Sequence, residues 1–143
     1  MTEHASQLPE PPRPEPPLEH RPYWDGLREH RLVLQRCARC GKLRHYPRPL
    51  CDACYSMDVE WSEVEARGTL HSWTVTHHPF HPGFKRQVPY CTVTVDLAEG
   101  VRLQAPLRDA TAAALESGMA VTIDYEDIDA ELTLPCVRLV GRA

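Results

Sequence analysis

Four cysteines form the most specific chemical pattern in this chain. They occur as two C-x-x-C pairs, Cys37 with Cys40 and Cys51 with Cys54, and ten residues separate the pairs. Two residues between thiolates allow one tight turn to direct both sulfurs at one ion, and two such turns complete a tetrahedron. We therefore predict one metal ion held by these four cysteines, with zinc preferred. Iron, which uses the same four sulfurs in rubredoxin-like sites, is the alternative, and unrelated reduced or redox-active cysteine pairs are a further one.

The predicted metal is structural rather than catalytic. Four protein ligands leave no coordination position for a substrate. In a segment too short to have its own core, the affinity for the metal becomes folding energy. Basic residues surround the pairs, and we interpret them as offsetting the thiolate charge, with phosphate binding as the alternative; they are Arg36, Arg39, Lys42, Arg44 and Arg48.

A second candidate site lies between Thr76 and Tyr90. This segment contains both phenylalanines of the chain, two cations and three histidines. Exposed aromatic residues beside cations are typical of a binding surface. The residues predicted to face a ligand or partner are Phe80, Phe84, Lys85, Arg86, Pro89 and Tyr90. Two alternatives are that the phenylalanines fold back over a barrel mouth, and that a second metal binds to His77, His78 and His81.

No catalytic residue is predicted. The chain has no glycine-rich phosphate loop, serine-elbow motif or H-E-x-x-H pattern. Cys91 and Cys136 lie among apolar residues of predicted strands, so they are interpreted as small buried hydrophobic residues. A small acyl-transfer enzyme that uses Cys91 or the histidines is the corresponding alternative.

The elements that must position these residues divide the chain into three parts. Residues 1–22 contain seven of the fourteen prolines, which predicts a disordered or partner-docked tail. Residues 23–64 are predicted to form a short helix, from about Tyr23 to Arg31, and a strand over Leu32–Leu34 that leads into the cysteine ribbon. Residues 65–143 form the third part.

Apolar residues alternate with polar ones in this third part. The alternation predicts strands over Leu70–Val75, Cys91–Leu97, Val101–Leu107, Met119–Tyr125 and Leu132–Val140. A short helix is predicted from Asp109 to Glu116, and Pro135 places the last strand at an edge or bulge. Five strands with one helix after the third is the order of an OB-fold barrel. The predicted fold class is therefore mainly β: an N-terminal helix and a rubredoxin-like zinc ribbon, then a five-stranded OB-fold barrel with one short helix.

The bulk composition excludes some functions. No apolar run is long enough for a membrane-spanning helix, so no membrane partner is predicted. The first residues lack the pattern of a secretory signal, and we expect a cytoplasmic protein with reduced thiols. The formal net charge of −4 disfavours broad nucleic-acid binding.

Several short motifs occur together in an order that resembles one known family. They are Y-W-D-G-L, Q-R-C-A-R-C-G, C-D-A-C, V-P-Y, E-G-V-R and S-G-M. From about residue 22 to residue 141, the chain resembles small proteins that join a rubredoxin-like zinc ribbon to an OB-fold. These proteins were long described as a domain of unknown function, and many are encoded beside thiolase-like enzymes.

The resemblance implies a non-catalytic accessory subunit. Members of this family form hetero-oligomers with thiolases, thiolase-like aldolases or hydratases that act on acyl-CoA. By position, the segment Phe80–Tyr90 is implied to contact acyl-CoA or the partner's active site, and the helix residues Tyr23, Trp24 and Leu27 to form part of the subunit interface. Gly100 and Arg102 match the family's turn motif, which is structural.

A single-stranded nucleic-acid-binding protein is the alternative function, because OB-folds and zinc ribbons often bind nucleic acids. Base stacking requires exposed aromatic residues on the second and third barrel strands. The predicted outward residues there are Thr92, Thr94, Arg102 and Gln104, with Tyr90 as the only aromatic one. The predicted surface is therefore poor in stacking platforms.

Overall fold

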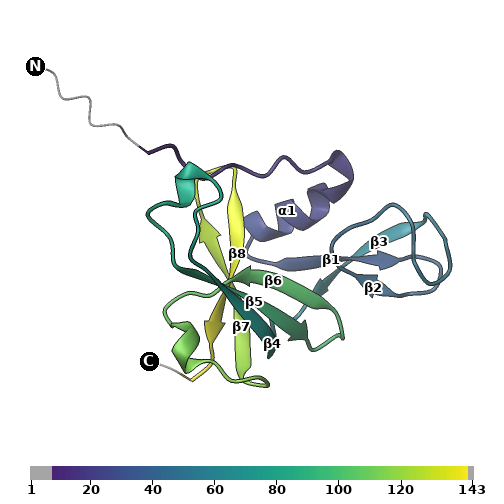
Figure 1. The fold of residues 1–143 in the computed structure, drawn as a ribbon. Coiled ribbons are helices and arrows are strands. Elements are labelled where there is room, and N and C mark those ends of the chain that lie inside the picture. Colours follow the sequence, from purple (N-terminus) through teal and green to yellow (C-terminus); the bar gives the residue numbers. More distant parts are fainter. Residues whose placement is uncertain (1–7, 142–143) are drawn as a thin grey trace, which may run out of the picture.

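The computed structural model describes residues 8–141, which form a three-stranded sheet and a five-stranded sheet with one helix packed against both (Figure 1). After an extended segment, the chain forms a 3₁₀ turn, η1 (Leu18–His20), and the helix α1 (Arg21–Arg28). Pro22 lies in the first turn of the helix, as predicted. The helix ends at Arg28 rather than near Arg31, because the Arg31 N–H donates to the Gly26 carbonyl and His30 takes a positive φ of 56°.

The ribbon contains three antiparallel strands, β1 (Leu32–Cys37), β2 (Leu43–Arg44) and β3 (Val59–Val64), in the order β2-β1-β3. The strand β1 begins where it was predicted and continues to the first cysteine. Sequence reasoning did not predict β3, whose residues VEWSEV are rich in acidic side chains. Only Glu65 and Ala66 separate β3 from the first barrel strand, and the Ala66 carbonyl accepts a hydrogen bond from the Ile123 N–H at 2.8 Å.

The barrel is built from five antiparallel strands in the order β6-β5-β4-β7-β8. They are β4 (Arg67–Thr76), β5 (Tyr90–Leu97), β6 (Arg102–Pro106), β7 (Ala120–Asp127) and β8 (Thr133–Leu139). A parallel bridge between Leu107 and Val137, with an Arg108 N–H to Val137 carbonyl bond of 2.9 Å, brings the two edges together. This is the strand order of an OB-fold, and Pro135 lies on the edge strand β8, as predicted.

Two local predictions change in the structure. Apolar and polar residues alternate imperfectly along β4 because its register with β5 shifts between Leu70 and Ser72. The helix predicted from Asp109 to Glu116 is only a 3₁₀ turn, η3 (Ala112–Ala114). Asp109 has a positive φ of 58° and so does not cap a helix.

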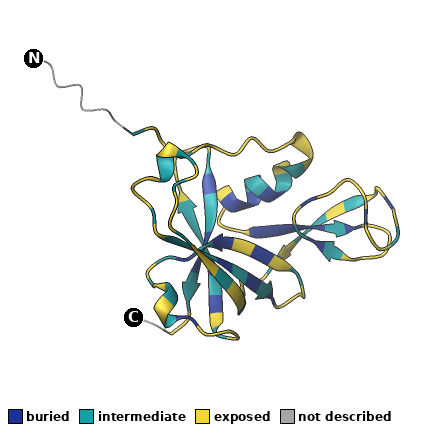
Figure 2. Cartoon of the chain, in the orientation of Figure 1, coloured by how far each residue is buried: buried dark blue, intermediate teal, exposed yellow. Residues whose placement is uncertain are grey.

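Helix, ribbon and barrel share one hydrophobic core (Figure 2). Its members include Tyr23 and Leu27 from α1, Leu32 and Leu34 from β1, and Leu70, Val93, Val95, Leu103, Val121, Ile123 and Val137 from the barrel. Gly68 lets β4 approach β5 closely, because a Cβ there would collide with the carbonyl of Asp96. Within residues 8–141, no helix is long and apolar enough to cross a membrane.

Candidate metal centre and partner-facing loop

The four predicted cysteine ligands converge on one point of the ribbon. Their sulfurs all lie within 4.8 Å of one another. The Sγ atoms of Cys37 and Cys54 are 3.6 Å apart, as are those of Cys40 and Cys51. Zinc–sulfur bonds of about 2.3 Å set sulfur–sulfur separations of about 3.8 Å in a tetrahedron. The cluster therefore has the size and the donor set of a tetrahedral thiolate site.

The backbone of the two knuckles lowers the pKa of the first thiol of each pair, whereas burial and the neighbouring sulfurs raise the pKa of Cys54 to about 11. The Cys40 N–H donates to the Cys37 sulfur at 3.4 Å, and the N–H groups of Cys40 and Arg39 lower the pKa of Cys37 to about 6. The N–H groups of Cys54 and Ala53 similarly lower the pKa of Cys51. A lower pKa favours the thiolate, which is the form that binds a metal.

The same type of turn follows both cysteine pairs, although the residue with positive φ differs between them. Gly41 has a φ of 78° and donates its N–H to the Cys37 carbonyl at 2.9 Å. Tyr55 has a φ of 62° and donates to the Cys51 carbonyl at 3.0 Å. The two turns are therefore equivalent in backbone geometry, and both direct their sulfurs at the shared centre.

Internal contacts engage three of the five basic residues near the pairs. Arg36 donates to the Ser62 hydroxyl and the Gly41 carbonyl, and Lys42 pairs with Asp52 at 2.8 Å. Arg44 is buried and donates to the Gln35 side chain at 2.6 Å. These three residues hold the ribbon together, which limits the phosphate-binding alternative to Arg39 and Arg48.

The two phenylalanines of the Thr76–Tyr90 loop lie in different environments. Phe80 is 81% exposed, and its ring packs edge-on against His78 with 4.9 Å between centroids. Phe84, in the 3₁₀ turn η2 (Pro82–Phe84), is half-buried and lies 5.8 Å from the ring of Tyr90. The structure thus presents Phe80 to solvent and uses Phe84 and Tyr90 within the loop.

The two cations of this loop, Lys85 and Arg86, are exposed, as Phe80 is. Lys85, Arg86 and Pro89 are all exposed. No ion pair of Lys85 or Arg86 occurs among residues 8–141. The exposed part of the loop therefore offers one aromatic ring and two cations that form no ion pair within residues 8–141.

The histidines of the loop do not form a second metal site in the described part of the chain. There, the four cysteines are the only group of three or more candidate ligands close enough to share an ion. His81 has a structural role, because its Nδ1 accepts the Gly83 N–H at 2.9 Å and so caps η2.

The remaining cysteines lack the features of a nucleophile. Cys136 is fully buried, and burial raises its pKa to about 11. Burial also raises the pKa of Cys91, which is half-buried on β5. Both are held as thiols, whereas the thiolate is the reactive form.

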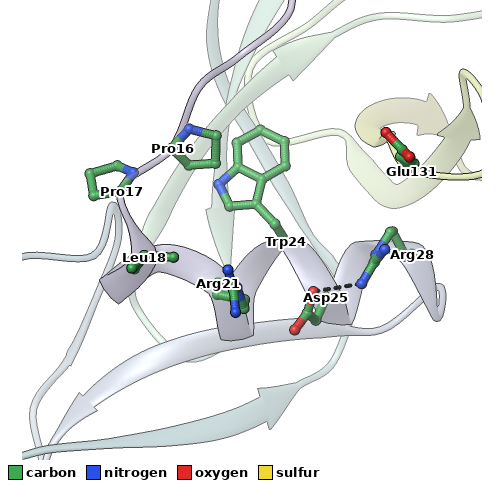
Figure 3. Close-up of a pocket in the computed structure, with 8 residues that line it drawn as sticks. All are labelled: Pro16, Pro17, Leu18, Arg21, Trp24, Asp25, Arg28 and Glu131. Carbon is green, nitrogen blue, oxygen red and sulfur yellow. Dashed lines mark hydrogen bonds and ion pairs between the residues drawn. The ribbon is translucent and has the colours of Figure 1, made fainter.

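The predicted helix interface is corrected by the burial of two of its three residues. Tyr23 and Leu27 are 3% and 0% exposed and belong to the chain's own core. They therefore present no side-chain surface to a partner. Trp24 is half-buried and lines a pocket of about 510 Å³ between α1 and the extended N-terminal segment (Figure 3). The other lining residues are Pro16, Pro17, Leu18, Arg21, Asp25, Arg28 and Glu131.

The face proposed for nucleic-acid stacking is occupied by cross-strand polar contacts. Arg102 donates to Asp96 at 2.7 Å, and Gln104 donates to the Thr94 hydroxyl at 3.2 Å. The aromatic side chains among the exposed large hydrophobic residues are Tyr46, Tyr55 and Phe80, and none lies on β5 or β6. This face therefore lacks the stacking platforms that single-stranded nucleic acids require.

One contact of the loop was not predicted from the sequence. The N-terminal segment passes across η2, because a Cβ on Gly83 would lie 2.5 Å from the backbone nitrogen of Pro11. Residues 8–17 thus lie against the barrel of their own chain, while residues 1–7 of the predicted tail lie outside the described residues. Proline content indicated an extended segment but gave no information on the surface it contacts.

Ribbon and barrel each match a known domain. Residues 24–60 match the family described as "ChsH2, rubredoxin-like zinc ribbon domain", and residues 61–126 match "ChsH2, C-terminal OB-fold domain". A four-cysteine ribbon followed by an OB-fold is therefore the class of protein to which the chain belongs.

Relatives specify the family further. The chain is 43% identical over 141 residues to a probable enoyl-CoA hydratase alpha subunit of Thermomonospora curvata. It is 40% identical over 105 residues to the 3-oxo-4,17-pregnadiene-20-carboxyl-CoA hydratase alpha subunit of Mycobacterium tuberculosis. These matches cover 96% and 73% of this chain but only 43% and 33% of the two relatives, so the chain spans less than half the length of either.

Relatives of similar length are scaffold proteins. A DUF35 domain-containing scaffold protein of Pyrococcus furiosus is 32% identical over 106 residues, which cover 73% of this chain and 76% of that protein. A solved structure titled "Ltp2-ChsH2(DUF35) aldolase" superimposes with a TM-score of 0.79 at 39% identity and covers 89% of this chain and 98% of that one. The chain belongs to the ChsH2/DUF35 family of zinc-ribbon and OB-fold proteins.

Proposed function

We propose that this chain is a non-catalytic accessory subunit of an enzyme complex that acts on acyl-CoA. It would hold one structural zinc ion and, through the Thr76–Tyr90 loop, contact acyl-CoA or complete the substrate channel of a thiolase-like, aldolase or hydratase partner. The exposure of Phe80, Lys85 and Arg86 on one loop is the observation that carries this proposal. Coenzyme A offers phosphates to the cations and apolar groups to the ring.

The relatives support the same class of function. Two are named as alpha subunits of acyl-CoA hydratases, one structure is titled as an aldolase with a DUF35 component, and others are named scaffold proteins. The metal centre offers four protein ligands and no open position, so it supports folding rather than chemistry. Iron at this centre remains the alternative, because the four sulfurs suit either metal.

Binding to a partner is tested by coexpression with an acyl-CoA enzyme encoded beside this chain. We expect the two proteins to coelute on size exclusion, with metal retained in the complex. Phe80→Ala should weaken the complex or lower the partner's turnover without changing the metal content. Val140→Ala removes a 52% exposed hydrophobic residue that follows β8, next to Ala120 at the start of β7, and serves as the control. Complete separation of the wild-type proteins at micromolar concentration would contradict the proposal.

Contact with acyl-CoA is tested separately by titration of the complex. Lys85→Ala with Arg86→Ala should weaken acyl-CoA binding several-fold and reduce its salt dependence, because two cations near the phosphates are removed. The same double substitution should leave the complex assembled. An unchanged affinity would restrict the loop to contacts with the partner protein.

A further inference from the structure

The N-terminal segment contacts the rest of the chain at two points and lines a pocket with it at a third. At the first, its backbone at Glu10 and Pro11 lies directly on Gly83 of η2. At the second, Arg13 donates to both carboxylate oxygens of Asp129, at 2.7 and 3.4 Å, in the turn between β7 and β8. At the third, Pro16 lies toward the indole of Trp24 where the two line the pocket beside α1 (Figure 3).

The three points have the chemistry that recognises proline-rich peptides. Such peptides dock as extended chains on surfaces that offer an aromatic ring to a proline. An acidic residue that pairs with a basic residue of the peptide fixes its register. Trp24 supplies the ring and Asp129 supplies the carboxylate. Gly83 has no side chain, so the peptide backbone can approach it closely.

The segment itself has the matching sequence, P-E-P-P-R-P-E-P-P over residues 9–17. Pro17 takes φ −59° and ψ 158°, which is polyproline II geometry. Leu8 and Pro11 are half-buried against the barrel, whereas the rest of residues 9–17 is exposed. Arg13 is attracted by Glu10 and Glu131 as well as by Asp129, so its guanidinium lies among three carboxylates.

We propose that Gly83, Asp129 and Trp24 form a binding surface for a proline-rich segment, and that residues 8–17 of the same chain occupy it. The occupied surface includes η2, so the docked segment braces the Thr76–Tyr90 loop against the turn between β7 and β8. Release of the segment exposes the side of the loop that carries Gly83 and removes the steric restraint on the loop backbone. This inference concerns the chain alone and does not depend on the proposed function.

Gly83 offers a steric test of the contact. Its φ is not in the left-handed region, so alanine is compatible with the backbone of the loop itself. The added Cβ would instead collide with the backbone of Glu10 and Pro11. Gly83→Ala should therefore displace the segment while the barrel stays folded.

The ion pair offers a charge test in the full-length chain. Arg13→Asp should accelerate hydrogen–deuterium exchange of the loop amides between residues 83 and 88 by roughly two- to fivefold, the effect of one exposed ion pair. Arg13→Lys keeps the positive charge and should keep the exchange slow; Asp129 is left unchanged because its Oδ1 also accepts the N–H groups of Glu131 and Leu132, at 2.8 and 2.9 Å. Glu15→Lys changes the charge of an exposed residue in the same segment and should leave the exchange unchanged.

Two further readouts separate docking from a general loss of stability. The chemical shift of the Trp24 indole N–H should change in both Gly83→Ala and Arg13→Asp, and that of the Gly83 N–H should change with it in Arg13→Asp. The amides of β5 should keep their protection in both variants. The proposal is overturned if loop exchange is unchanged in Gly83→Ala or in Arg13→Asp, or if Arg13→Lys accelerates it as much as Arg13→Asp does.

Discussion

Substitution of Leu34 tests whether ribbon and barrel fold as one unit. Leu34 lies on the ribbon strand β1 but is 0% exposed, and it belongs to the same core cluster as Val93 and Val121 of the barrel. Truncation of a fully buried leucine to alanine costs about 2–5 kcal/mol, through lost burial and the cavity that remains. For a chain of this size, a loss of about 3 kcal/mol corresponds to a melting temperature lower by roughly 6–12 °C.

The three tryptophans allow this prediction to be measured in each part of the chain. Trp24 lies on α1, Trp61 on the ribbon strand β3 and Trp73 on the barrel strand β4, and all three pack against the core. Variants that keep only Trp61 or only Trp73 report urea unfolding of the ribbon and of the barrel by fluorescence. With zinc held constant, Leu34→Ala should shift both transitions by the same amount.

Leu50→Ala is the matched control for this experiment. Leu50 also lies in the ribbon, directly before Cys51, but it is 45% exposed. Its truncation should change the free energy of unfolding by no more than about 0.5 kcal/mol. Two separate transitions, with Leu34→Ala affecting only the Trp61 signal, would refute the single shared core.

Three other predictions follow from the metal centre, the barrel and the N-terminal segment. Cys51→Ser should abolish stoichiometric metal binding, measured by elemental analysis, and unfold the ribbon, whereas full metal retention would contradict the four-ligand site. Gly68→Ala should cost about 1–3 kcal/mol in urea unfolding, because its Cβ would collide with the Asp96 carbonyl; a neutral effect would show that β4 and β5 can separate freely. Arg13, together with the N–H groups of Glu131 and Leu132, lowers the pKa of Asp129 to about 2, so the contribution of these contacts is present above pH ~4 and is lost as the pH falls through about 2. In an NMR titration, Arg13→Ala should raise the pKa of Asp129 toward its ordinary value, and an unchanged pKa would exclude the contact.

The metal centre and the barrel strands could be predicted because local pattern determines them. Two C-x-x-C turns fix the sulfur positions by backbone geometry, and period-two alternation identified all five barrel strands. The strand β3 was missed because alternating charged residues in VEWSEV hide its half-buried positions. The helix expected after Asp109 was overestimated because a run of alanines favours helix in isolation, whereas here it forms one 3₁₀ turn.

Tertiary contacts explain the remaining differences between prediction and structure. Helical spacing placed Tyr23, Trp24 and Leu27 on one face but did not reveal that this face packs onto the chain's own core. Proline content predicted a disordered or partner-docked tail and did not predict that residues 10 and 11 lie on Gly83 of the same chain, about seventy positions away in the sequence. Such long-range contacts have no local sequence signal.

The strand β4 determines the distance between the ribbon and the Thr76–Tyr90 loop. It joins the ribbon at Arg67 and enters the loop at Thr76, and ten extended residues span roughly 30 Å. Because only Glu65 and Ala66 separate β3 from β4, the length of β4 determines how far the Phe80 loop lies from the ribbon. A partner bound to the ribbon therefore meets the loop at a fixed distance. Lengthening β4 by two residues would increase this distance by about 7 Å and keep every side chain on its own face of the sheet.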